Sequence, residues 1–278
     1  MSISPQGFCV VITRPDAQAA PWAEHLQTLG FSCARVSLLD IVAVSTDEKI
    51  RAIKNKILDF DLYQKVIFVS QNAVDYGMDW LEDYWPQLPI GIEYFAVGAT
   101  TAKKLAGYGI KVQDLAISSR GGMTSEDLLN AAHLQHVDGE KILIFRGCGG
   151  RGHLAEELRK RGAWVDYCEV YERLLPAQAT EQLAQLFAAE KVVKSRMVMS
   201  LHSGESLHNL LSALAQLPTA QQPLVTQWMQ EIQVLVPSQR LVETAQIAGF
   251  KHIIRAENAT DSAMTTALLD FCRTQECI

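Results

Sequence analysis

The residues best placed to do chemistry in this sequence follow short apolar runs, at points where a buried strand would give way to a helix. They are mainly hydroxyl-bearing, glycine and arginine residues, in the segments Thr13–Pro15, Ser70–Asn72, Gly98–Thr101, Arg146–Arg151, Ser203–Gly204 and Pro237–Ser238. At the start of a helix, free backbone N–H groups and the helix dipole favour an anion. In open α/β sheets the ligand crevice lies beyond the carboxyl ends of the strands. Several such turns around one cleft therefore predict a ligand with several carboxylates or phosphates.

The most glycine-rich of these turns is Arg146-Gly-Cys-Gly-Gly-Arg151. It matches neither the GxxxxGK[ST] pattern of a P-loop nor GxGxxG, so a nucleotide site has little support. A turn of this kind either binds an anion or is only a tight connection between a strand and a helix, and the sequence favours neither. The same choice applies to the arginines, which pair with a ligand carboxylate or cap a neighbouring carbonyl.

Other kinds of catalytic site lack their usual sequence patterns. The chain contains no HExxH, CxxC or DxDxD motif, so we expect no metal. It also contains no GxSxG nucleophile elbow. His202 precedes Ser203 at a predicted strand end, but a Ser–His pair needs partners from elsewhere in the fold. The role of His202 therefore stays open.

Short apolar runs alternate with amphipathic stretches along the whole chain. We predict strands at residues 8–13, 32–36, 65–70, 94–97, 141–145, 165–170, 196–201, 233–236 and 252–254. We predict helices at residues 17–29, 100–108, 125–132, 152–161, 205–214, 239–248 and 262–271, and a surface loop with a short helix at residues 216–230. Continuous apolar strands that alternate with helices predict an α/β fold with parallel sheets covered on both faces.

Part of this pattern occurs twice. Several residues recur 132 positions later, so that Ile12, Arg14, Ala23, Glu24, Leu26 and Gly30 match Ile144, Arg146, Ala155, Glu156, Leu158 and Gly162. The turns at Ser70 and Ser203 also correspond, as do those at Thr124 and Thr260. The first copy, in the middle of the chain, is continuous. The second copy lies at the C-terminal end and lacks its last strand–helix segment, whose counterpart is the N-terminal segment of the chain. The strand–helix segments of the two copies therefore follow one another in a different order along the sequence. Chance similarity between α/β units is the alternative explanation.

The repeat predicts two similar domains, one of them discontinuous. We expect residues 1–37 and 177–278 to form one α/β domain and residues 41–170 to form a second one inserted in it. The chain would then cross between them near residues 38–44 and 168–176. Both crossings are apolar and β-prone, which favours a two-stranded antiparallel hinge. Two such domains form a cleft, and a cleft is the usual place for a ligand.

Composition limits the class of protein. The chain is 48% hydrophobic and 20% charged, which is enough for packed cores. Its net charge of -6 argues against a general nucleic-acid binder. The cysteines show no paired spacing, and no segment resembles a signal peptide or approaches the roughly 20 apolar residues of a membrane span. We therefore expect a soluble, cytoplasmic protein without nucleic-acid or membrane partners, and a monomer.

Taken in order, the turns and strands resemble the uroporphyrinogen-III synthase family. The segments that carry the resemblance are Val11–Pro15 with Gln18, Phe68–Val74, Phe95–Ala102, Ile144–Arg151 through Val170–Tyr171, and Val236–Arg240 with Glu257–Thr260. The resemblance implies two flavodoxin-like α/β domains with parallel sheets flanked by helices, joined by a two-stranded antiparallel hinge. It also implies closure of the linear tetrapyrrole hydroxymethylbilane to uroporphyrinogen III, with inversion of ring D and loss of water, in heme biosynthesis. Members of this family use no cofactor and no metal.

The resemblance also assigns site residues. Tyr171 matches the family tyrosine at the end of the second crossing, and we expect it to be the acid that protonates the departing hydroxyl. Phenols, with an ordinary pKa of about 10, stay protonated at neutral pH. Packing in the hinge is the other role open to Tyr171, and Tyr167 is an alternative acid. The residues expected to bind the substrate are Arg14, Ser70, Asn72, Thr100, Thr101, Arg146, Arg151, Ser203 and Ser238. The family more often has threonine or a second small polar residue near Leu201-His202-Ser203, where this chain departs from it.

Two other functions are compatible with the same sequence features. A non-catalytic two-domain protein that closes by a hinge on an anionic small ligand would have the same fold and cleft. A nucleotide-dependent enzyme would have to bind ATP or NAD. Tyr171 and the ordered set of turns favour the synthase.

Overall fold

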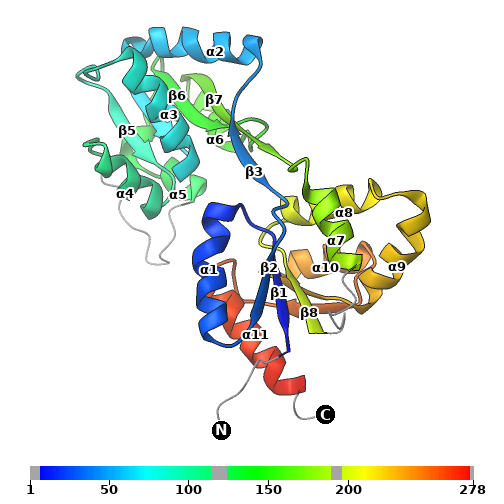
Figure 1. Ribbon diagram of the computed structural model, residues 1–278. Helices are drawn as coiled ribbons and strands as arrows, with labels where there is room; N and C mark the ends of the chain where they lie inside the picture. The colour runs from blue at the N-terminus through cyan, green and yellow to red at the C-terminus, as the bar shows by residue number, and fades with distance from the viewer. Residues whose placement is uncertain (1–6, 114–123, 189–195, 276–278) are drawn as a thin grey trace. The chain divides into compact units, whose positions relative to one another are not determined.

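The chain forms two compact units in the computed structural model, which describes residues 7–113, 124–188 and 196–275 (Figure 1). Unit 1 comprises Met1–Asp40 and Leu174–Ile278, and unit 2 comprises Ile41–Arg173. The chain therefore leaves unit 1 after Asp40 and returns to it after Arg173. Among the described residues, none of the helices combines the length and the apolar character that a membrane span needs.

Unit 1 is built on a five-stranded sheet. Its strands are β1 (Cys9–Ile12), β2 (Ser32–Arg35), β8 (Met197–Ser200), β9 (Gln233–Val236) and β10 (His252–Arg255). They lie in the order β10-β9-β8-β1-β2, and every pair is parallel. Its helices are α1 (Asp16–Thr28), α7 (Ala179–Ala188), α8 (Gly204–Ala215), α9 (Gln222–Glu231), α10 (Gln239–Ile247) and α11 (Asp261–Gln275), with a 3₁₀ turn at Thr219–Gln221.

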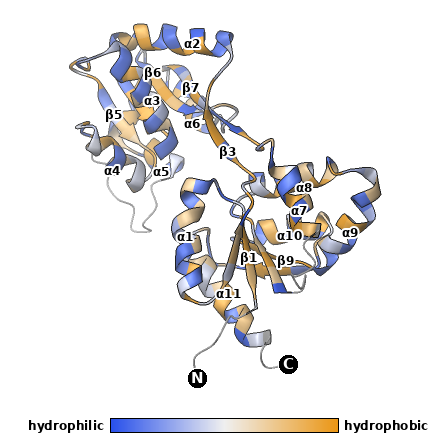
Figure 2. Ribbon diagram, viewed as in Figure 1, coloured by the Kyte–Doolittle hydropathy of each residue, from blue (hydrophilic) through white to orange (hydrophobic). Residues whose placement is uncertain are grey.

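Alternate residues of these strands build two cores, one on each face of the sheet. Val10 packs with Trp22 of α1 and Leu268 of α11 in one core. Val11 packs in the other core with residues of α8, α9 and α10, among them Leu210. A parallel sheet that is covered on both faces needs apolar side chains along its whole strands. Figure 2 shows this pattern, with hydrophobic strands and helices of mixed character.

Unit 2 contains the second five-stranded sheet. Its strands are β3 (Asp40–Ala43), β4 (Lys65–Phe68), β5 (Glu93–Ala96), β6 (Lys141–Gly147) and β7 (Trp164–Leu174), in the order β3-β7-β6-β4-β5. The pairs β4–β5, β4–β6 and β6–β7 are parallel, and Val112 adds a single parallel bridge to Tyr94 beyond β5. The helices are α2 (Asp47–Leu58), α3 (Gln71–Tyr84), α4 (Ala99–Gly107), α5 (Ser125–Leu129) and α6 (His153–Lys160), with 3₁₀ turns at Phe60–Leu62 and Ala132–Leu134.

The two sheets share one strand order, which confirms the repeat. Counted along the chain, the strands of unit 1 lie in the order 2-1-3-4-5, which is the flavodoxin order. Unit 2 has the same order when the count begins at β6 and ends at Val112. The units are therefore circular permutations of each other. In this order the topological switch point lies between β1 and β8 in unit 1, and between β6 and β4 in unit 2.

The predicted fold class and all predicted strands are confirmed. Strand bounds agree within two residues, except that β7 continues to Leu174. Residues 216–230, predicted as a surface loop with a short helix, contain a helix that is longer than expected: Gln222–Glu231 form α9, which buries Val225 and Trp228. These two apolar residues are three positions apart, which is the spacing of residues on one helix face. The glutamines around them made this apolar face hard to recognise in the sequence.

Candidate active site

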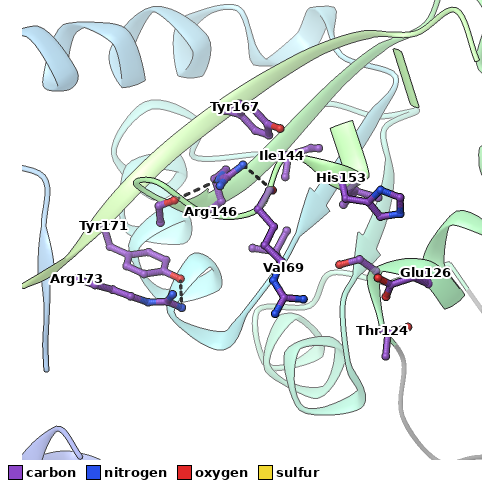
Figure 3. A pocket seen from close by; sticks show the side chains of 14 residues that line it. Val69, Thr124, Glu126, Ile144, Arg146, His153, Tyr167, Tyr171 and Arg173 are labelled. Atoms are coloured by element: carbon purple, nitrogen blue, oxygen red, sulfur yellow. Dashed lines mark hydrogen bonds between the residues drawn. The ribbon is translucent and has the colours of Figure 1, made fainter. Parts of the chain in front are cut away.

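A cavity of about 320 Å³ lies within unit 2, at the carboxyl ends of β4 and β6 (Figure 3). Its lining residues are Val69, Thr124, Ser125, Glu126, Ile144, Arg146, Gly147, Gly150, Arg151, His153, Leu154, Tyr167, Tyr171 and Arg173. Strands β4 and β6 flank the switch point, which is where sheets of this order bind ligands. Arginines on the wall outnumber the acidic side chains, because Glu126 is the sole carboxylate among these residues. The charge of the cavity therefore favours an anion.

Tyr171 reaches the cavity because strand β7 is irregular. Arg146 pairs with Glu169 and Gly147 pairs with Tyr171, which leaves Val170 without an opposite residue. A bulge of this kind re-aims the side chains next to it. The Tyr171 ring is 1% exposed and covers Gly147, where an added Cβ would lie 2.5 Å from a ring atom. The observed ring position therefore requires glycine at residue 147.

The hydroxyl of Tyr171 has two polar neighbours. Ser70 Oγ lies 3.1 Å from it. Arg173 Nη2 donates to it at 3.5 Å, as the dashed line in Figure 3 shows. Ser70 is the N-cap of α3, and its Oγ accepts the Ala73 N–H at 3.1 Å. Because a guanidinium only donates, the Tyr171 oxygen is the acceptor toward Arg173. The phenol proton can thus be given to Ser70 or to an acceptor that enters the cavity.

Arg146 holds the loop between β6 and α6. Its Nε donates to the Gly147 carbonyl at 3.2 Å, and its Nη1 donates to the Arg151 carbonyl at 3.1 Å. Its guanidinium is buried over the Tyr167 ring, 4.3 Å from the ring centroid, with Glu169 3.8 Å away. Of the two roles open to this arginine, the structure shows carbonyl capping. Arg151 is exposed on the cavity wall, and its guanidinium makes no hydrogen bond or ion pair with described residues.

The corresponding residues of unit 1 contact one another. Arg14 Nη1 donates to Asp261 Oδ1 at 2.5 Å. The His202 ring lies edge-on to Trp22 with 5.2 Å between the centroids, and neither of its nitrogens has a hydrogen-bond partner in the described part of the chain. Burial, and then the positive charge of Arg14, lower the pKa of His202 to about 3. His202 is therefore a neutral packing residue at neutral pH.

Comparison with known proteins separates this chain from other flavodoxin-like folds. It matches the family model of uroporphyrinogen-III synthase HemD over residues 20–266. It is 29% identical over 262 residues to the uroporphyrinogen-III synthase of Escherichia coli K12, which covers 93% of this chain and 99% of that protein. It is 30% identical over 210 residues to the Proteus mirabilis uroporphyrinogen-III synthase, which covers 73% of this chain and 98% of that protein.

The chain belongs to the uroporphyrinogen-III synthase family. The activity of the family is that of a hydro-lyase. The uroporphyrinogen-III synthase of Thermus thermophilus, solved as a mutant, has a TM-score of 0.59 at 14% identity and covers 98% of this chain and 100% of that one. The Helicobacter pylori synthetase also has a TM-score of 0.59 at 14% identity, and covers 94% of this chain and 98% of that one. At such low identity these structures support the fold alone.

The other residues that the family resemblance assigned to substrate binding do not line the cavity. Ser203 and Ser238 are the N-caps of α8 and α10 in unit 1. Thr101 is buried in the first turn of α4, and Thr100 is exposed beside it. Asn72 is half-buried in the first turn of α3. Their part in substrate binding, like that of Arg14, stays a prediction.

Several cavity residues were missed in the sequence. Arg173 follows Tyr171 by two positions on one strand, so both side chains face the same side of the sheet. The two-residue repeat of a β-strand could therefore have identified Arg173 as a neighbour of Tyr171. Thr124 forms a capping box with Asp127 at the start of α5 and brings Glu126 to the cavity. Hydrogen bonds from its own N–H and from Thr124 lower the pKa of Glu126. The described residues include no group of three or more His, Cys, Asp or Glu that could hold a metal ion.

Proposed function

We propose that this chain converts hydroxymethylbilane to uroporphyrinogen III, closing the linear tetrapyrrole with inversion of ring D and loss of water. The family supplies the reaction, and the structure supplies an acid in a suitable place. The observation that carries the proposal is the Tyr171 hydroxyl, which is fixed by Ser70 and Arg173 beside an arginine-lined cavity.

Tyr171 is proposed to act as the general acid when the hydroxyl group leaves. The C–O bond breaks, its electron pair goes to oxygen, and the phenol proton completes a water molecule. The guanidinium of Arg173 stabilises the phenolate that is left, because a hydrogen bond from a charged donor is strengthened by the new negative charge. The pyrrole N–H proton then returns to the phenolate, so that the net loss is one water and the product is a neutral azafulvene. Ring D attacks this electrophile through its substituted carbon, and the spiro intermediate fragments and recloses.

Control of substrate conformation is the second task proposed for the protein. The linear substrate cyclises unaided without inverting ring D, so the enzyme has to favour one geometry. Positioning of this kind can supply about 7–11 kcal/mol of barrier lowering in well-oriented reactions. We assign it to contacts with the substrate carboxylates, by Arg151 at the cavity, and elsewhere by Arg14, Asn72, Thr100, Thr101, Ser203 and Ser238.

We also propose that the family's two domains are residues 1–37 with 177–278 and residues 41–170, joined by a two-stranded antiparallel hinge. The division of the chain into units after Asp40 and Arg173 supports this. We propose a cytoplasmic monomer that needs no cofactor. Cys9, Cys33, Cys148 and Cys168 are free thiols, as is usual in a reducing compartment.

Tyr171→Phe tests the proposed acid. The ring and its stacking on Tyr76 are kept, so the fold should be retained, while the proton and the contacts to Ser70 and Arg173 are lost. We expect formation of the III isomer to slow by about ten-fold or more, the low end of the usual general-acid contribution. The assay supplies hydroxymethylbilane and separates the I and III products by chromatography. Full activity of this variant, together with loss of activity in Tyr167→Phe, would move the acid to Tyr167. A wild-type chain that yields only the I isomer would refute the synthase function.

A further inference from the structure

The duplicated fold contains two equivalent places at the switch point, one in each unit, and they can be compared residue by residue. Thr124 and Thr260 each accept the N–H of the third residue of the helix that follows, Asp127 and Ala263 respectively. The first residue of that helix is Ser125 in α5 and Asp261 in α11. By the same repeat, Arg146 corresponds to Arg14, Leu154 to Trp22, and Val69 to His202.

In unit 1 the equivalent residues contact one another. The carboxylate of Asp261 binds Arg14, and the ring of Trp22 lies edge-on to that of His202. In unit 2 the helix begins with an uncharged serine, and the ring positions carry Leu154 and Val69. A cavity of about 320 Å³ is left there. That volume is at the lower end of the 300–1,000 Å³ of small-molecule sites. It therefore suits one substituted ring of a large ligand rather than four.

The charges that face this cavity favour a carboxylate. Arg151 presents an exposed guanidinium at its wall, and Arg173 and His153 lie on other parts of it. Glu126 opposes an anion, and the positive charge of Arg151 is among the influences that lower the pKa of Glu126. Two nitrogens of the buried Arg146 are already used within the protein: Nε donates to the Gly147 carbonyl and Nη1 donates to the Arg151 carbonyl. Through these two nitrogens, Arg146 does not compete with Arg151 for a ligand.

We propose that the unit 2 cavity is a carboxylate site for the substrate: one carboxylate-bearing pyrrole arm enters it and pairs with Arg151, because Nε and Nη1 of Arg146, the counterpart of Arg14, bind loop carbonyls. Arg146 acts as a positioning residue that holds the loop carrying Arg151. This inference rests on the proposed function, because it takes its ligand from the tetrapyrrole substrate.

Ser125→Asp tests the site by giving unit 2 the internal carboxylate that unit 1 already has. An aspartate at the first position of a helix is favourable, so the variant should fold. Its carboxylate should compete with the substrate arm and raise KM about ten-fold or more, with kcat within about three-fold of wild type, since a bond to a charged group is usually worth about ten-fold or more in affinity. Thr46→Asp is the matched control, because it adds a carboxylate at the exposed N-cap of α2 in the same unit, outside the cavity. A KM unchanged by Ser125→Asp, or raised equally by Thr46→Asp, overturns the proposal.

Arg151→Gln and Arg146→Lys test the two arginines. Arg151→Gln should raise KM by about ten-fold to a hundred-fold. Arg146→Lys should raise it as well, because a lysine cannot hold both carbonyls, and it should add little in the double variant, since both changes act on one contact. Additive effects would overturn the positioning role, and a normal KM in Arg151→Gln would overturn the site. If Arg146→Lys fails to fold, Ser125→Asp and Arg151→Gln still decide. A wild-type chain that makes no uroporphyrinogen III would instead overturn the proposed function.

Discussion

Gly147→Ala is expected to disable Tyr171 without touching its hydroxyl. A Cβ at residue 147 would lie 2.5, 2.7 and 3.0 Å from three atoms of the Tyr171 ring. Ordinary contact begins near 3.4 Å, so the ring has to move by about 0.9 Å away from residue 147. A shift of that size disturbs the 3.1 Å contact with Ser70, because hydrogen bonds depend on donor–acceptor distance and angle. A misplacement of about 1 Å at a reacting group can cost about a hundred-fold in rate, so we expect kcat for the III isomer to fall between ten- and a hundred-fold.

The assay compares kcat for the III isomer with the free energy of unfolding, measured by denaturant titration. Overpacking should cost about 1–3 kcal/mol, which leaves a folded protein to assay. Gly107→Ala is the matched control, because this residue ends α4 in the same unit and an added Cβ meets nothing within 4 Å. The control should be neutral or stabilised by up to about 1 kcal/mol. If Gly147→Ala retains wild-type kcat and isomer ratio, the bulge does not set the position of the acid, and the role given to Tyr171 has to be abandoned.

Two further predictions concern the hydroxyl contact and the buried histidine. Ser70→Ala removes both an N-cap and the 3.1 Å partner of Tyr171, so it should cost about 1 kcal/mol of stability and lower kcat by several-fold. It should add little to Tyr171→Phe in a double-mutant cycle, whereas additive losses would show that Ser70 acts independently of Tyr171. His202→Phe should reduce the fall in the free energy of unfolding that acid causes. The pKa of His202 is about 3 in the folded state and about 6.5 in the unfolded state, so the unfolded state binds the proton first as pH falls. The wild type should therefore lose stability relative to this variant as pH falls from about 6.5 toward 3, by up to about 1.4 kcal/mol per pH unit, and parallel curves from denaturant titrations at several pH values would contradict this.

The strands and most helices could be predicted because their signals are local. A buried parallel strand such as Val10–Ile12 is apolar along its length, and a helix start such as Ser70 or Thr124 has its capping residue in place. The length of helix α9 was underestimated because glutamines surround its apolar face. The end of β7 was placed at residue 170, and the β-prone crossing predicted at residues 168–176 is partly the continuation of the same strand to Leu174.

The candidate site was predictable only in part. Tyr171, Ser70 and Arg151 were found from the family resemblance; Tyr171 and Arg151 line one cavity, and Ser70 contacts the Tyr171 hydroxyl. Arg146 was expected to bind the substrate; it lines the cavity and caps loop carbonyls, so its part in substrate binding stays a prediction. Arg173 was missed because its relation to Tyr171 depends on a strand running through that point.

By itself, the sequence determined the strand and helix pattern, the doubled unit with its rotated order, and the family. These depend on apolar runs, caps and repeated residues, which the chain carries wherever it folds. Only the tertiary structure decided that Val170 bulges so that Tyr171 covers Gly147 and meets Ser70. It also decided that a cavity lies at the switch point of unit 2, and that in unit 1 Trp22 lies against His202. Register and cavity volume are properties of side chains packed from several strands and helices at once, so no local sequence signal encodes them.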